Sequence, residues 1–106
     1  MSTPTHATLA TFRMDLDREA EQRAGLETMI VPGVRRHPGF VGGTWTLDCE
    51  TSESFVMLTY ASHESAQAMR ADIVGNAENQ RFVGIELIDV RVLEVSASAA
   101  AADQAG

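Results

Sequence analysis

Four segments of the chain alternate apolar and polar residues, which is the pattern of a strand with one buried face. They cover residues 7–14, 40–49, 54–61 and 85–95. In the third segment Phe55 and Met57 point to one face, and the other face carries Val56, Leu58 and Tyr60. Large apolar side chains therefore lie on both faces of this strand.

The first and last strands have the same two-sided character. Leu9 points away from Phe12 in the first strand. The last strand is predicted to place Ile85, Leu87 and Leu93 on one face and Ile88, Val90 and Val92 on the other. If Cys49 pairs with Ser54 in the second and third strands, then Trp45 shares a face with Tyr60.

Two helices are predicted between these strands. Apolar residues at about 100° per residue mark the first, namely Leu16, Ala20, Leu26, Ile30 and Val34. Asp15 or Asp17 is expected to cap its start, and Pro32 to kink or end it. Ser62 is expected to cap the second, whose apolar side includes Ala66, Met69 and Ile73, with a short further helical piece at residues 76–81.

The resulting order, βαββαβ, predicts a ferredoxin-like α+β fold with a four-stranded antiparallel sheet and two helices on one face. Two helices can cover only one face of that sheet. The other face would expose a large apolar patch, so we expect the open faces of two copies to pack together as a homodimer.

Composition narrows the classes of function. The formal charge is −7, and all eight basic residues are Arg, so a nucleic-acid partner is not expected and RNA binding of the RNA-recognition-motif type is rejected. No apolar run is long enough to span a bilayer, and no membrane partner is expected. The single Cys49 excludes an internal disulfide and fits a cytoplasmic protein, and no metal site is expected. We expect a flexible N-terminus at 1–5, a folded domain at 6–95 and a flexible Ala/Ser-rich tail at 96–106.

Three short motifs carry a family resemblance. They are PGFVGG at 38–43, LTYAS at 58–62 and HESAQA at 63–68. With this strand and helix order, the chain resembles the dimeric α/β-barrel superfamily, and within it the antibiotic-biosynthesis-monooxygenase-like group. The resemblance implies a dimer whose two sheets form a barrel with the helices outside. It also implies an apolar pocket between sheet and helices in each protomer.

Members of this superfamily include cofactor-independent oxygenases and haem-degrading enzymes. Haem is disfavoured here, because the interior positions of the second helix are Met69, Ile73 and Val74 rather than a histidine, and the first strand lacks Asn. The resemblance therefore implies a monooxygenase-like protein that acts on a small aromatic substrate without a cofactor. The alternative is a non-catalytic, ligand-binding or stress-related dimer.

Three residues are candidates for catalysis. Trp45, the only tryptophan, is expected either to hold a flat substrate or to pack in the core. Tyr60, the only tyrosine, is expected to donate a hydrogen bond to a substrate oxygen or to lie half-buried with a wet hydroxyl. His63 is either a base at the start of the second helix or an exposed residue. His6 and His37 are assigned no role.

Four further residues are candidates for substrate binding, namely Phe12, Met69, Ile73 and Arg91. The first three are expected to line the pocket with apolar surface. Arg91 shares a strand face with Asp89, so it is either one half of a structural ion pair or a clamp for an anionic substrate.

Overall fold

The structure is a computed structural model that describes residues 3–101. Its strands are β1 (His6–Met14), β2 (Phe40–Trp45), β3 (Glu53–Tyr60) and β4 (Ile85–Glu94). Its helical segments are η1 (Leu16–Arg18), α1 (Glu19–Gly25), η2 (Leu26–Ile30), α2 (Val31–Arg35), α3 (His63–Gly75) and α4 (Ala77–Arg81). The order confirms the predicted βαββαβ arrangement.

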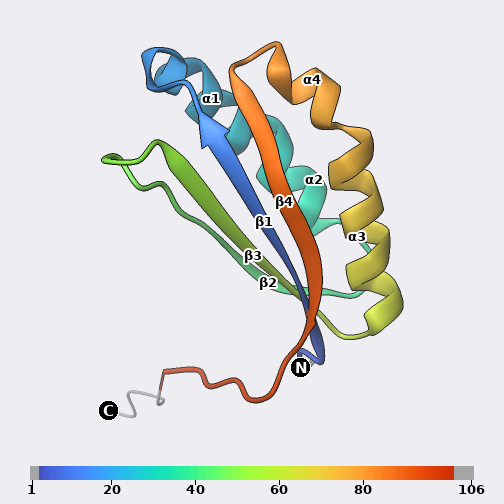
Figure 1. Cartoon of the computed structure of the whole chain (residues 1–106). Helices are drawn as coiled ribbons and strands as arrows, with labels where there is room; N and C mark the ends of the chain where they lie inside the picture. The colour runs from blue at the N-terminus through green and yellow to red at the C-terminus, as the bar shows by residue number, and fades with distance from the viewer. Residues whose placement is uncertain (1–2, 102–106) are drawn as a thin grey trace.

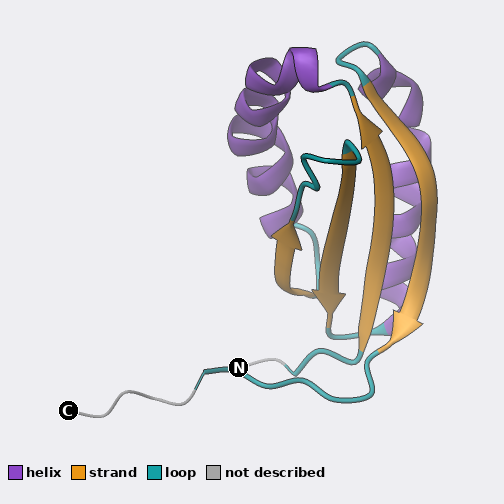
Figure 2. Ribbon diagram, turned by 60° about the vertical axis from the view of Figure 1, so that its left-hand side comes forward, coloured by secondary structure: helices purple, strands orange, loops and turns teal. Residues whose placement is uncertain are grey.

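The four strands form one antiparallel sheet in the order β2-β3-β1-β4 (Figure 1). The helices cover one face of it, and the other face is left open (Figure 2). Residues 3–5 and 96–101 form neither helix nor strand, whereas residues 1–2 and 102–106 of the predicted flexible ends lie outside the described residues. No helix among residues 3–101 is both long and apolar enough to cross a membrane.

The core lies between the sheet and the helices. Its buried apolar residues are Ala10, Val56, Leu58, Tyr60, Ala66, Met69 and Val90. Val56, Leu58 and Tyr60 share one face of β3, as the alternation predicted, and the structure shows that this is the helix-covered face. The open face carries Phe55, Met57 and Ile88, each about two-fifths exposed.

Both predicted helices form, and the caps are confirmed. The Asp15 side chain accepts a hydrogen bond from the Asp17 amide at the start of η1, and the Ser62 hydroxyl accepts one from the Ser65 amide at the start of α3. The first helix does not end before Pro32. It passes through one π-helical turn, η2, and continues into α2, with Pro32 in the first turn of α2, where a missing backbone donor costs least.

Two details of the strands differ from the prediction. Strand β2 stops at Trp45, and beyond it the pairing continues with a hydrogen bond from the Thr46 amide to the Phe55 carbonyl (3.1 Å) and an isolated bridge between Asp48 and Glu53. A bulge in the β1–β4 register between Asp89 and Leu87 shifts the alternation by one residue. Leu87 therefore lies on the helix-covered face, and the prediction that it shares a face with Leu93 is wrong.

Candidate functional site

Tyr60, the last residue of β3, is the centre of the candidate site. Its backbone pairs with Phe40 of β2 and with His6 of β1, and its side chain is fully buried (0% exposed) on the helix-covered face. The rings of Phe40 and His37 meet the phenol ring edge-on, at centroid distances of 5.8 and 5.6 Å. The sheet and the turn after α2 therefore hold the phenol in one position.

Within the described residues 3–101, the Tyr60 hydroxyl has no hydrogen-bond partner, although it is buried. Most buried side-chain polar atoms in folded proteins are paired, so an unpaired one calls for a reason. Burial raises the pKa of Tyr60 well above its usual value, and the negative charge of Asp72 on α3 raises it further. The phenol is therefore neutral at any physiological pH and can donate a hydrogen bond.

His37, whose ring contacts that of Tyr60, provides a second unpaired polar atom. Its Nδ1 atom is buried without a partner, while its Nε2 atom lies 3.5 Å from a carboxylate oxygen of Asp72. With the ring proton on Nε2, facing that carboxylate, Nδ1 keeps its lone pair and is able to accept a proton. Tyr60 and His37 thus contribute a hydrogen-bond donor and a proton acceptor on two rings in edge-on contact.

Gly39 positions His37 in this turn. Its φ of +80° is a conformation that glycine adopts readily, and a side chain there would collide with Ser65 of α3. The His37 carbonyl accepts a hydrogen bond from the Phe40 amide (3.2 Å), and the Gly39 carbonyl accepts one from the Ala61 amide (2.9 Å). The turn is therefore packed against the start of α3, which brings the imidazole over the sheet.

Trp45 lies on the same face of the sheet as Tyr60, as predicted, and its partner in β3 is Val56. Tyr60 is four positions after Val56 in β3, which is about 13 Å at the rise of a strand. Gly43 lies on this face between Trp45 and Phe40, and a side chain on it would touch Leu58, Phe40 and Trp45. The two aromatic residues thus lie at opposite ends of one apolar surface.

The structure brings together some of the other candidates and separates the rest. Phe12 and Ile73 pack against the core that contains Tyr60 and Met69, so three of the four substrate-binding candidates lie on the helix-covered face. Arg91 lies on the open face, where it pairs with Asp89 at 2.7 Å. It is therefore not part of the Tyr60 site, and the ion pair is the role that its geometry supports.

His63 is exposed at the start of α3, and its ring packs edge-on against that of His6 at 5.0 Å. The imidazole beside Tyr60 is that of His37, to which the sequence pattern assigned no role. The signal for His37 was weak, because the side chain belongs to a turn and its direction depends on contacts with α3. The Pro38-Gly39 pair marked that turn and was the only available indication.

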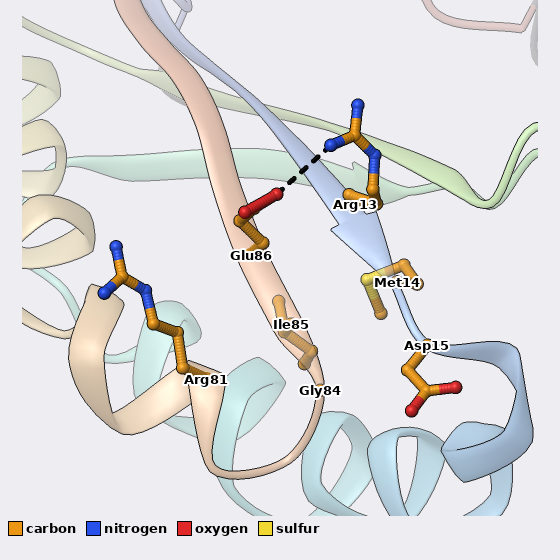
Figure 3. A pocket seen from close by; sticks show the side chains of 7 residues that line it. All are labelled: Arg13, Met14, Asp15, Arg81, Gly84, Ile85 and Glu86. Carbon is orange, nitrogen blue, oxygen red and sulfur yellow. Dashed lines mark hydrogen bonds and ion pairs between the residues drawn. The ribbon is translucent and has the colours of Figure 1, made fainter.

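Tyr60 has no exposed surface in this conformation. Among residues 3–101, a surface pocket of about 320 Å³ at the start of β4 (Figure 3) and another of the same volume beside the open face are lined by neither Tyr60 nor His37. The covering segment from Leu16 to Arg35 is lightly packed, since Gln22 is its only buried residue and Met29 is 73% exposed.

No family model matches the chain, and a comparison with curated proteins finds no match. Solved structures do share its architecture. A monooxygenase of Streptomyces coelicolor from the gene ActVA-Orf6, in complex with nanaomycin D, is 10% identical, with a TM-score of 0.63 and coverage of 95% of this chain and 94% of that one. The chain has the fold of the antibiotic-biosynthesis-monooxygenase-like structures.

Two further structures support this. One, assigned to the antibiotic biosynthesis monooxygenases of Deinococcus radiodurans, is 12% identical, with a TM-score of 0.63 and coverage of 94% of this chain and 99% of that one. The other, a protein of unknown function from Nitrosomonas europaea, is 17% identical, with a TM-score of 0.65 and coverage of 97% and 100%. At these identities the likeness concerns the fold, and the chemistry has to be argued from the site.

Proposed function

We propose that the chain is a monooxygenase-like protein that oxidises a small hydroxylated aromatic compound bound between the sheet and the helices, without a cofactor. The observation that carries this proposal is the pair of buried, unpaired atoms, Tyr60 Oη and His37 Nδ1, on an aromatic surface. The hydroxyl of a phenolic ligand would accept a hydrogen bond from Tyr60 Oη and donate one to His37 Nδ1. The fold shared with a monooxygenase supports the same class of reaction.

The proposed chemistry assigns one task to each residue. His37 Nδ1 accepts the phenolic proton, and Tyr60 donates a hydrogen bond to the resulting oxyanion. The electron-rich ring then reacts with dioxygen at an unsubstituted carbon, and loss of water from the hydroperoxide leaves a quinone. One atom of dioxygen enters the quinone, and the other leaves as water.

The neutral state of Tyr60 fits this assignment. Its raised pKa prevents it from acting as the base, so the proton has to go to another group. The Asp72 carboxylate lies 3.5 Å from His37 Nε2 and so faces the side of the imidazole away from Nδ1. Trp45, at the far end of the apolar surface, is placed to stack on the second ring of a bicyclic substrate.

The proposal includes a homodimer through the open face of the sheet. Phe55, Met57 and Ile88 are each about two-fifths exposed there, and they occupy three of the large apolar positions outside the core. Each chain carries a charge of −7, so two copies repel each other. The free energy gained by burying apolar surface has to exceed this repulsion, and the open face is where apolar surface is available.

A non-catalytic ligand-binding protein is the second candidate. It is favoured by one observation, that neither pocket reaches Tyr60, so the site is closed in the absence of ligand. Such a protein would use the same two polar atoms to hold a hydroxylated aromatic molecule without transforming it. The two candidates differ in whether bound ligand consumes oxygen.

The test is oxygen uptake with 1,5-dihydroxynaphthalene, together with quinone formation followed by absorbance. The expected result is one quinone formed per dioxygen consumed, with kcat lowered by about 10²-fold or more in His37→Gln. Arg36→Gln, an exposed neighbour of His37, is the control and should keep the wild-type rate.

His63→Gln separates the two histidines. Loss of activity there, with His37→Gln unaffected, would move the role of base to His63 and contradict the proposal. Quenching of Trp45 fluorescence by the ligand, with no oxygen uptake above the background rate, would select the non-catalytic candidate.

A further inference from the structure

Two histidine rings meet at the end of the sheet where β1 begins and β4 ends, which is also where α3 begins (Figure 1). His6 is the first residue of β1 and His63 the first of α3, and their ring centroids lie 5.0 Å apart with an interplanar angle of 79°. His6 is half-buried and His63 is exposed, so ions in solvent can reach this pair of rings. The proposed function uses neither ring.

The distance between the two rings is the distance that a shared metal ion requires. An ion about 2.0–2.1 Å from one nitrogen of each ring lies about 3.2 Å from each ring centre, and ligand angles of about 90–110° then place the two centres about 4.5–5.2 Å apart. The observed 5.0 Å falls within this range. Rotation about the bond between Cβ and the ring redirects the nitrogens, leaves the ring centre nearly in place and is only weakly restricted. The exposed His63 ring can therefore turn a nitrogen toward such an ion.

The hydroxyl of Thr5 orients the His6 ring as the rings of metal-bound histidines are oriented. Thr5 Oγ1 lies 2.9 Å from His6 Nδ1. A metal-bound histidine almost always makes a hydrogen bond through its second ring nitrogen, which fixes both the tautomer and the ring. With the proton on Nδ1 donated to Thr5, the lone pair of His6 Nε2 is free. Within residues 3–101, no hydrogen bond or ion pair occupies His6 Nε2 or either ring nitrogen of His63.

Two carboxylates give the surroundings of the pair a negative charge. Glu94 lies opposite His6 in the β1–β4 register, and Glu64 follows His63 in α3. Neither carboxylate forms an ion pair in the described part of the chain, so both charges are available to attract a cation against the positive end of the α3 dipole. No group of three His, Cys, Asp or Glu residues among 3–101 could hold a metal ion, so the two imidazoles would be its protein ligands.

We infer that His6 and His63 together bind one divalent transition-metal ion of the kind that imidazole prefers, such as Zn²⁺, Ni²⁺ or Cu²⁺, with water in the remaining positions. Only the folded chain brings the two rings together, because they are far apart in the sequence. A bound ion therefore joins the start of β1 to the start of α3 and stabilises the folded chain. The inference does not depend on the proposed function, because it concerns other residues and needs no chemical step.

A titration of the ¹³C,¹⁵N-labelled chain with ZnCl₂, followed by the imidazole NMR signals of its three histidines, tests the inference. The expected result is that the signals of His6 and His63 shift together, with one Kd below about 1 mM, while those of His37 do not move. EDTA should reverse the shifts. The midpoint of thermal unfolding should rise with the Zn²⁺ concentration by mass action.

His6→Gln and His63→Gln are the decisive variants. Each should raise the Kd for Zn²⁺ about tenfold or more, because each leaves a single imidazole. His37→Gln is the matched control, because it removes the third histidine, and it should leave the Kd unchanged. An unchanged Kd in either decisive variant, or no saturable shift up to about 5 mM Zn²⁺, would overturn the inference. Shifts centred on Cys49 or on His37 instead would assign the ion to another group and would overturn it too.

Discussion

Two unpaired polar atoms in a small core are the most informative residue-level feature of this protein. An unsatisfied buried hydroxyl typically costs about 1–3 kcal/mol of stability. The Tyr60 hydroxyl and His37 Nδ1 both lack partners, and they belong to rings in edge-on contact. A ligand that pairs with both would relieve this cost, so the arrangement favours binding over stability of the free chain.

Replacement of Tyr60 by Phe should therefore stabilise the protein. Tyr60→Phe removes the unpaired hydroxyl and keeps the ring, and we expect the free energy of unfolding in urea to rise by about 1 kcal/mol. Thr8→Val is the matched control, because the buried Thr8 hydroxyl donates to the Ala66 carbonyl at 2.8 Å. It should lower the free energy of unfolding by about 1 kcal/mol. A loss of stability in Tyr60→Phe would mean that its hydroxyl is satisfied in solution.

Tyr60 also predicts a pH dependence of stability. Its pKa is raised in the folded chain, so between the unfolded-state pKa of about 10 and the folded-state pKa the folded chain holds more protons than the unfolded chain. The free energy of unfolding should therefore fall as the pH rises above about 10, and Tyr60→Phe should remove this part of the fall. Because Tyr60 is the only tyrosine, the ultraviolet absorbance of tyrosinate reports its titration directly. Titration at its ordinary pKa in the folded protein would contradict the burial.

At the level of the elements, the sequence predicted correctly those features that depend on neighbouring residues alone, namely helix caps and the alternation of side chains along a strand. Asp15 and Ser62 cap helices as expected, and the alternation in β3 correctly put Val56 and Tyr60 on one common face. The bulge in β4 was not predictable, because it depends on how β4 meets β1. That bulge displaced Leu87 from its expected face.

The candidate site was predicted only in part for a similar reason. Tyr60 and Trp45 lie on strands, whose period of two sets the direction of each side chain. His37 lies in a turn, and its direction follows from the contact between Gly39 and Ser65, which are far apart in the sequence. Arg91 was predicted to share a face with Asp89, and it does, but which face it is depends on the register with β1.

Gln22 is the residue that joins α1 to the start of β4. It is 7% exposed, and its side-chain amide donates to the carbonyl of Asp15, which precedes η1, and to that of Val83, which lies just before β4. Gln22→Met keeps the volume but leaves these carbonyls unpaired, so we expect a loss of about 1–3 kcal/mol in the free energy of unfolding. Gln67→Met, on the exposed side of α3, should change it by less than about 0.5 kcal/mol. Equal effects of the two substitutions would contradict the role given to Gln22.

For the molecule as a whole, the open face of the sheet is the apolar surface that the helices leave uncovered. Met57 in its middle is 39% exposed, and Val74, on the helical side, is 49% exposed. If two copies meet through the open face, Met57→Asp should bury an unpaired charge and raise the dimer dissociation constant about 100-fold or more. Val74→Asp, equally polar but on the other side, should leave it unchanged. Sedimentation equilibrium at micromolar concentration measures both. A monomeric wild-type chain, or a dimer that survives Met57→Asp, would contradict the proposed contact.

The central claim is that Tyr60 and His37 form a binding site for a hydroxylated aromatic molecule. A crystal structure of the chain with 1,5-dihydroxynaphthalene tests it most directly. We expect a ligand oxygen within about 2.7–3.0 Å of both Tyr60 Oη and His37 Nδ1, with the segment from Leu16 to Arg35 displaced from the sheet. A saturated crystal in which the two atoms remain without a ligand, or in which the ligand lies only on the open face, would contradict the claim.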